Sequence, residues 1–308
     1  MEHLDGFAPL AHRYDGFILD LWGVIHDGIT AFPHAVECLR QLRAAGKPTL
    51  LLSNVPRPNA AVQTMMRGMG IEDTLYTHIL TSGEAVRRAL AAPPDLWWAE
   101  LGTRLFHLGP ARDRPVFANL PGYTEAATPA EADFVLNTGP DDHLDPTDLS
   151  AFEPILAEAA RHRLKMICAN PDLAVIRGGK RVLCAGALAE RYQAMNGDVR
   201  ALGKPDPAIY QPALAALNIH PDRVLAVGDS LHTDIAGAIG VSLDSCWVQS
   251  GLHAAALANT PAETLARAAG TLPTTTIPRF AWQPTPTCTP PRPAPASRER
   301  RIRDGCGG

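Results

Sequence analysis

The sequence lacks a surplus of charge of one sign, paired cysteines and long apolar runs. It has 28 Lys and Arg against 32 Asp and Glu, a net charge of -4, so no basic excess points to nucleic acid or to an anionic membrane surface. None of its 6 cysteines forms a C-x-x-C pair, which favours reduced, mostly buried thiols over zinc or disulfides. No apolar run could span a bilayer, and the charged N-terminus has no signal-peptide core. We therefore expect a cytoplasmic protein that binds neither nucleic acid nor membranes.

The composition that is present suits a folded protein of more than one domain. Hydrophobic residues make up 46% and charged residues 19% of the 308 positions, which argues against wholesale disorder. Single hydrophobic cores seldom grow beyond about 250–300 residues. Two domains are therefore the default expectation.

Short apolar runs that end in polar residues predict a parallel sheet. The runs FILDL (17–21), PTLLLSN (48–54) and VLAVGDS (224–230) have the continuous apolar character of strands buried on both faces. Helical patterns lie between them, one after Pro33 and one around 60–68. This alternation predicts an α/β protein with a doubly wound, Rossmann-like parallel sheet.

A second set of elements interrupts this pattern after the Pro93–Pro94 break. Candidate strands at 105–109, 133–139 and 164–170 and helices at 146–162 and 186–195 read as a second α/β domain inserted into the first. From 271 onward Pro, Thr and Arg dominate, and such a segment buries too little apolar area to offset its ordering entropy. We therefore expect a core of 1–85 and 201–270, a cap of 86–200, and a disordered tail of 271–308.

Polar residues stand where the predicted core strands end. Asp20, Ser53–Asn54 and Asp229 occupy three such ends, and Lys204 lies in a loop before the last strand. Ligands of open parallel sheets bind at this edge, and two close carboxylates would repel unless a cation or a proton lay between them. Mg²⁺ with oxygen ligands is the expected cation. Beside it and Lys204, Asp20 could attack phosphorus and form an aspartyl-phosphate.

Each of these residues also has a plain structural interpretation. Asp20 alone could be a turn residue, Asp234 could cap a helix, and Lys204 could be a solvated loop lysine. The prediction therefore depends on their order and context, not on any one residue.

The ordered motifs resemble a known superfamily. LDLWGVIHDG, LLLSNVPR, LGKPDPAIY and VGDSLHTDIAGA resemble the haloacid dehalogenase superfamily, and the segment that begins ANPDLAVIRGG looks like its type IIA branch, similar to NagD-like and 4-nitrophenylphosphatase-like proteins. The resemblance covers roughly residues 15–255. It implies a Rossmann-like core with an inserted α/β C2-type cap and hydrolysis of small phosphorylated metabolites such as sugar or nucleotide phosphates. It also allows a homodimer.

The resemblance assigns roles to residues at matching positions. The implied catalytic residues are the nucleophile Asp20, the phosphate-contacting Ser53 and the motif lysine Lys204. The implied Mg²⁺ ligands are Asp20, the Trp22 backbone carbonyl, Asp229 and Asp234. The implied substrate contacts are Asn54, Arg57, Asn170 and Asp172.

Trp22 departs from the phosphatase pattern D-x-D. The second acid of that pattern protonates the leaving alcohol and later activates water, which an indole cannot do at neutral pH. His26 or Asp27, in the same loop, could supply the proton, although a role in the loop alone is the plainer interpretation of both.

Three functions follow from this departure. The chain could be a phosphatase that is slow or restricted to good leaving groups, which we rank first. It could instead be a binding or regulatory module that keeps the metal site and no turnover. It could also be a dehalogenase, since DLWG resembles the D-x-Y-G of haloalkanoate dehalogenases, although those enzymes usually carry a small helical cap.

Overall fold

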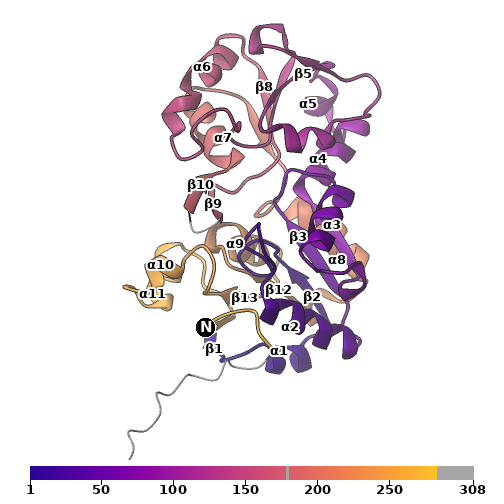
Figure 1. The fold of residues 1–308 in the computed structure, drawn as a ribbon, viewed down its shortest axis with the longest axis vertical. Helices are drawn as coiled ribbons and strands as arrows, with labels where there is room; N and C mark the ends of the chain where they lie inside the picture. The colour runs from indigo at the N-terminus through magenta and orange to yellow at the C-terminus, as the bar shows by residue number, and fades with distance from the viewer. Residues whose placement is uncertain (178–179, 283–308) are drawn as a thin grey trace, which may run out of the picture.

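Two parallel sheets, each in a lobe of its own, organise the chain. A computed structural model describes residues 1–177 and 180–282. In Figure 1 the indigo N-terminal and orange C-terminal segments share the lower lobe, and the magenta and pink segment between them forms the upper lobe. The predicted α/β class with a separate inserted cap sheet is confirmed.

The lower lobe is built on a seven-stranded sheet in which every pairing is parallel. Strand β2 pairs with β3 on one side and with β12 on the other, so the strand order reverses beside it. The strands, in spatial order, are β1 (Glu2–His3), β14 (Thr275–Ile277), β13 (Asp244–Val248), β12 (Val224–Gly228), β2 (Gly16–Leu19), β3 (Thr49–Ser53) and β4 (His78–Thr81).

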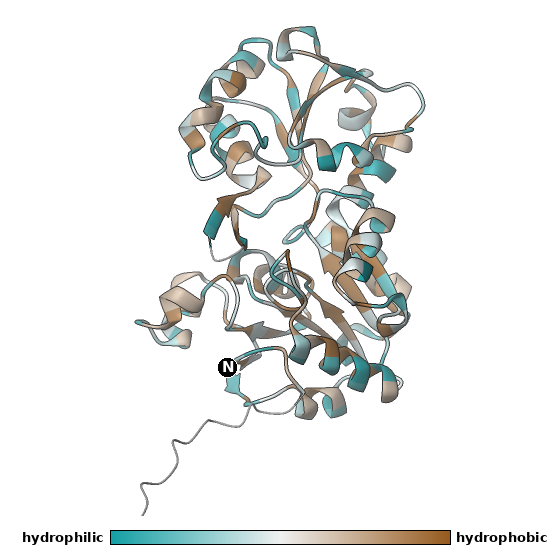
Figure 2. Ribbon diagram, in the orientation of Figure 1, coloured by the Kyte–Doolittle hydropathy of each residue, from teal (hydrophilic) through white to brown (hydrophobic). Residues whose placement is uncertain are grey.

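Helices cover both faces of this sheet, because successive residues of a strand point to opposite sides. Leu19 packs into the cluster formed with the first helices, whereas its neighbour Ile18 packs against α8 and α9. The apolar strands lie between these layers (Figure 2). The helices of the lower lobe are α1 (Ala8–Arg13), α2 (Pro33–Ala44), α3 (Asn59–Gly68), α8 (Pro207–Leu217), α9 (Ala236–Gly240), α10 (Ala254–Leu257) and α11 (Ala262–Ala268).

The prediction of disorder from residue 271 is wrong for 271–282. Thr275–Ile277 forms β14, which lies between β13 and β1 in the core sheet. Phe280 is fully buried and its ring centroid lies 4.8 Å from that of Phe7. Threonine is enriched in strands. Thr275 and Thr276 can be buried because their hydroxyls donate hydrogen bonds to backbone carbonyls. The remainder of the predicted tail, 283–308, lies outside the described residues.

The upper lobe holds a five-stranded parallel sheet, and a short antiparallel hairpin lies between the lobes. The hairpin joins β9 (Ala174–Arg177) and β10 (Lys180–Leu183). The sheet strands, in spatial order, are β11 (Val199–Ala201), β8 (Lys165–Cys168), β7 (Phe134–Asn137), β5 (Arg104–Leu108) and β6 (Thr124–Ala126). The helices beside them are α4 (Ser82–Ala91), α5 (Leu96–Ala99), α6 (Glu153–Arg161) and α7 (Ala185–Ala194).

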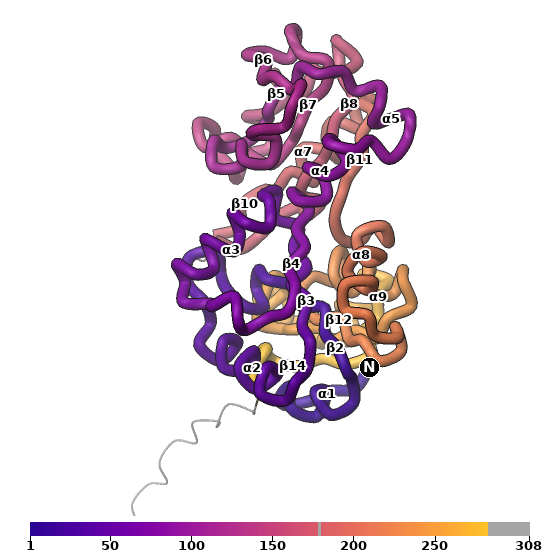
Figure 3. The backbone as a smooth tube through the Cα atoms, turned by 90° about the vertical axis from the view of Figure 1, so that its right-hand side faces the viewer, coloured from indigo at the N-terminus to yellow at the C-terminus, as the bar shows by residue number. Residues whose placement is uncertain are grey.

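The chain passes between the lobes twice, once into α4 and once out of β11 (Figure 3). The two crossings are tied together, because the Ser82 hydroxyl donates to the Leu202 carbonyl. The predicted helix of 146–162 begins later, with a 3-10 turn at Leu149–Phe152 that Asp148 caps by accepting from the Ser150 N–H. A π-helical turn, Leu231–Ile235, leads directly into α9.

Two expectations about composition can be compared with the described residues. Their four cysteines, Cys38, Cys168, Cys184 and Cys246, are free and buried, as predicted. Cys288 and Cys306 lie outside the described residues. Within 1–177 and 180–282, the helices are all too short or too polar to cross a membrane.

Candidate active site

Two adjacent strands deliver carboxylates to the same edge of the core sheet. Asp20 directly follows β2 and Asp229 directly follows β12, and these strands pair in register through Leu19 and Val227. Carboxyl ends of parallel strands meet at one edge, which is where open α/β sheets bind ligands. Asp20 and Asp229 are 7% and 8% exposed. The predicted convergence of strand-end acids is therefore present.

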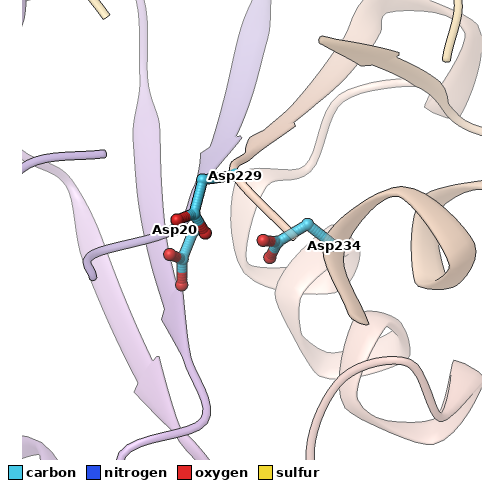
Figure 4. A group of neighbouring side chains, drawn as sticks. All are labelled: Asp20, Asp229 and Asp234. Carbon is cyan, nitrogen blue, oxygen red and sulfur yellow. The ribbon is translucent and has the colours of Figure 1, made fainter. Parts of the chain in front are cut away.

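Asp234 completes a group of three carboxylates. It lies in the π-helical turn after β12, and its Oδ2 accepts a hydrogen bond of 3.0 Å from the Ser230 N–H. One oxygen from each of Asp20, Asp229 and Asp234 lies within 4.8 Å of the other two. Figure 4 shows the three side chains turned toward one another.

Lys204 is buried between two of these acids. Its Nζ lies 2.5 Å from Asp20 Oδ1 and 2.6 Å from Asp234 Oδ1, and it donates a third hydrogen bond of 3.0 Å to the Leu52 carbonyl. Burial alone would lower the pKa of this amine, but the two carboxylates outweigh burial and raise it well above its ordinary value. Lys204 is therefore a fixed cation that orients the Asp20 carboxylate.

The single positive charge of Lys204 does not balance the negative charge of the three carboxylates. Lys204 bonds to Asp20 and Asp234, so the unbalanced charge lies at Asp229. Burial raises the pKa of Asp229 and of Asp20, and the neighbouring carboxylates raise the pKa of Asp229 further. A hydrogen bond of 2.6 Å from the Leu252 N–H is the stabilising contact on Asp229 Oδ2. Three close oxygen donors with unbalanced charge fit a hard divalent cation such as Mg²⁺.

Glycines leave room for this carboxylate. A Cβ atom on Gly23, whose φ is +78°, would lie 2.1 Å from Asp229 Oδ2, and a Cβ on Gly251 would lie 1.9 Å from the same oxygen. Real side chains do not tolerate such distances, so both loops approach Asp229 only because they lack a side chain. The two loops therefore pack closely against the Asp229 carboxylate.

Ser53 and Asn54 have different positions although they are neighbours. Ser53 ends β3, is buried and lines the cavity above Asp20. Asn54 is buried behind the site, where its Oδ1 accepts from the Lys204 N–H at 2.7 Å and its Nδ2 donates to the Lys204 carbonyl at 2.9 Å. The same Nδ2 donates to Asp172 Oδ1 at 3.0 Å. Asn54 thus fixes Lys204 and Asp172, a task that sequence reasoning missed.

Trp22 reaches across to the upper lobe. Its indole N–H donates to the Ile176 carbonyl of β9 at 3.0 Å, so Trp22 contacts the hairpin. A Cβ on Gly28 would lie 2.2 Å from the indole ring, which places the loop backbone directly against it. The sequence carried no signal for the Trp22–Ile176 contact, because residues 154 positions apart meet only in the folded chain.

Neither predicted substitute acid in this loop is suited to donate a proton. His26 is almost fully buried, its Nδ1 accepts from the Gly28 N–H, and burial lowers its pKa to about 4. The Asp27 carboxylate accepts from the Thr30 and Ile29 N–H groups, which lower its pKa. His26 is therefore neutral and Asp27 ionised near pH 7, and both stabilise the loop.

The remaining predicted contacts line cavities between the lobes. A cavity of about 220 Å³ is lined by the three acids together with Trp22 and Asp172. A neighbouring cavity of about 370 Å³ is lined by Ser53, Arg57 and Asn170 as well. Arg57 Nε lies 3.2 Å from Asp113 Oδ1 in the upper lobe, and both side chains are largely buried. Arg57 thus also links the lobes.

A buried strand-end aspartate, a lysine beside it, further acids after the neighbouring strand and an inserted cap are together typical of one class of hydrolase. Comparison with known proteins agrees. Residues 17–120 match the family model described as haloacid dehalogenase-like hydrolase, and 201–274 match the model described as HAD-hydrolase-like. The chain belongs to the haloacid dehalogenase-like hydrolases, in their type IIA branch.

Individual relatives share the architecture across most of the chain. A haloacid dehalogenase-like hydrolase from Brucella suis is 31% identical, with a TM-score of 0.77 over 91% of this chain and 100% of that one. Chronophin from Bos taurus is 29% identical over 76% of this chain and 81% of its own. The acid sugar phosphatase of Staphylococcus aureus is 25% identical over 78% of this chain and 88% of its own.

Proposed function

We propose that the chain is a Mg²⁺-dependent phosphatase of small phosphate monoesters, such as sugar or nucleotide phosphates, that acts through an aspartyl-phosphate on Asp20. The observation that carries this proposal is the buried contact of Asp20 with Lys204 beside the unbalanced charge of Asp229. Support also comes from the similarity to chronophin and to an acid sugar phosphatase.

The proposed metal site uses residues that the chain already brings together. Asp20, Asp229, Asp234 and the Trp22 carbonyl would hold the cation. When bound, Mg²⁺ would neutralise phosphate charge and so lower the repulsion between an anionic ester and a carboxylate. Asp234 also bonds to Lys204, so it would serve the site chiefly by orienting that lysine.

In the proposed reaction Asp20 attacks phosphorus with one carboxylate oxygen. Lys204 and the Ser53 hydroxyl hold the oxygens of the transferring group, where negative charge accumulates. The ester oxygen leaves with the electron pair of its bond to phosphorus and takes up a proton. Water then attacks the aspartyl-phosphate, releasing phosphate and restoring Asp20. Arg57 and Asn170 line the space that the rest of the substrate would fill.

We also propose a domain division that fits these roles. Residues 1–85 and 201–282 would form the core, and 86–200 the cap. The last core boundary is moved from 270 because β14 belongs to the core sheet.

The test is phosphate release from a broad panel of monoesters, with wild type and Asp20→Asn measured side by side. We expect Mg²⁺-dependent release by wild type, abolished by chelation, and a loss of at least about 1,000-fold in Asp20→Asn. Absence of release by wild type over the whole panel would overturn the proposal. If ligands then bound equally to both proteins, the chain would be a binding module, and halide release from short haloacids would identify a dehalogenase.

A further inference from the structure

The proposed phosphatase lacks a proton donor at the position of Trp22. The leaving oxygen of an alkyl phosphate needs a proton, because an alkoxide is a poor leaving group at neutral pH. The indole N–H of Trp22 donates its hydrogen bond to the Ile176 carbonyl. It cannot act as an acid that gives up its proton near pH 7. Another group beside Asp20 must therefore carry the proton, or the enzyme is confined to good leaving groups.

The other acids around Asp20 are engaged elsewhere. Asp229 belongs to the proposed metal site, and Asp234 bonds to Lys204 and to the Ser230 N–H. Asp27 is held as a carboxylate by backbone N–H groups, and His26 is buried and neutral. Among the acids of the described chain that line the cavity with Asp20 and Trp22, this leaves Asp172.

Asp172 has the position that such a donor requires. It follows Asn170 and Pro171 at the base of the hairpin, and it lines both the small cavity and the larger one. It therefore lies where the nucleophile and the space for the leaving group meet. The Asn54 amide, which also fixes Lys204, donates to Asp172 Oδ1 and so orients the carboxyl relative to the catalytic lysine.

We propose that Asp172 is the general acid and base of this enzyme, replacing the acid that Trp22 displaces. This inference depends on the proposed function. In the first step Asp20 forms its bond to phosphorus, the bond from phosphorus to the ester oxygen breaks, and that oxygen takes the Asp172 proton. In the second step the Asp172 carboxylate takes a proton from water, whose oxygen bonds to phosphorus as the bond to Asp20 breaks. The products are alcohol and phosphate, and both aspartates return to their starting state.

The surroundings of Asp172 support this role. Burial raises the pKa of Asp172 above its ordinary value, Lys204 opposes that rise, and Asp234 adds to it. A carboxyl whose pKa is raised holds a proton closer to neutral pH and is a better acid for an alkoxide. The geometry and the charge therefore point to the same residue.

The test compares an ester with a good leaving group, 4-nitrophenyl phosphate, and one with a poor leaving group, glycerol phosphate. We expect Asp172→Asn to lower kcat/KM for glycerol phosphate by about 100-fold or more and for the aryl ester by less than about 10-fold, since only the alkyl ester needs the acid. The matched control is Asp142→Asn, which removes another carboxylate that lines the larger cavity and lies 2.6 Å from Arg112. It should leave the ratio between the two substrates unchanged.

Further measurements keep the proposal open to contradiction if Asp172→Asn folds poorly. Adding Trp22→Asp to Asp172→Asn should restore turnover of glycerol phosphate, and a double variant that cleaves only the aryl ester would contradict us. In wild type, kcat/KM for a series of phosphate esters should fall only weakly as the pKa of the leaving alcohol rises. A steep fall would overturn the proposal. Equal losses on both esters in folded Asp172→Asn would also overturn it, while leaving the phosphatase intact. Failure of wild type on both esters would instead defeat the proposed function.

Discussion

The two lobes bring very different surroundings to the cavity they share. On the core side, Asp20, Lys204 and Asp234 are each less than a tenth exposed, and the lysine donates hydrogen bonds to both carboxylates. On the cap side, the hairpin residue Ile176 is 36% exposed and contacts the core through its backbone carbonyl. A network buried in this way has one arrangement, because any displacement leaves a charge without a partner.

This difference assigns separate tasks to the lobes. The core holds the proposed nucleophile Asp20 and the charged groups around it rigidly, whereas the cap would supply the proposed acid and base, Asp172. The cap approaches through single contacts, such as Trp22 with Ile176, Asn54 with Asp172, and Arg57 with Asp113. Changes in the core should therefore damage both stability and turnover, whereas changes at the cap contacts should alter access and choice of substrate.

The largest effect should follow Lys204→Met. This change leaves Asp20 and Asp234 buried without their cation, so we expect a loss of about 3–5 kcal/mol in the free energy of unfolding. Turnover should fall by at least about 100-fold, as for loss of one group that stabilises transition-state charge. Chemical denaturation and phosphate release measure the two quantities. Lys47→Met, at a lysine paired with partly exposed Asp15, is the control and should cost less than about 1 kcal/mol.

The next largest effect should come from residues 271–282, for which the composition predicts disorder. Phe280→Ala removes a fully buried ring that packs against Phe7, and should cost about 3–5 kcal/mol. Leu96→Ala, at a leucine in the upper lobe that is 78% exposed, should change stability by about 0.5 kcal/mol or less. Thermal unfolding of both variants compares the regions. Equal melting temperatures would contradict the assignment of β14 and its neighbours to the core.

The smallest effect should follow Trp22→Phe. This change keeps an aromatic ring but removes the bond to Ile176, which is worth about 1 kcal/mol. Amide hydrogen exchange in β9 should therefore become faster, while exchange in β2 and β12 stays the same. Trp97→Phe is the control, since its indole N–H donates to Asp198 within the upper lobe. If exchange in β9 were unchanged in Trp22→Phe, the hairpin would be held by other contacts.

The core could be predicted from the sequence because its signals are local. Strands β2, β3 and β12 are continuous apolar runs, and Asp20, Ser53 and Asp229 stand at or directly after their ends. Parallel pairing alone then brings these ends together.

The missed features have no such local signal. β14 is three residues long and stands among prolines and threonines, so its burial depends on pairing with β13 and β1. The contacts of Trp22 and Asn54 join distant segments, and their bonding partners follow from how the cap lies on the core. Reasoning from the sequence therefore placed Asn54 among substrate contacts, whereas its amide is occupied by Lys204 and Asp172.

The central claim is that Asp20 becomes phosphorylated during turnover. The most direct measurement is acid quenching of the enzyme with Mg²⁺ and 4-nitrophenyl phosphate, followed by mass spectrometry of its peptides. The account predicts a phosphoryl group on the peptide that contains Asp20, absent from Asp20→Asn and increased when Asp172→Asn slows the attack of water. Rapid turnover without a phosphoryl group on Asp20, or with one on a different residue, would contradict it.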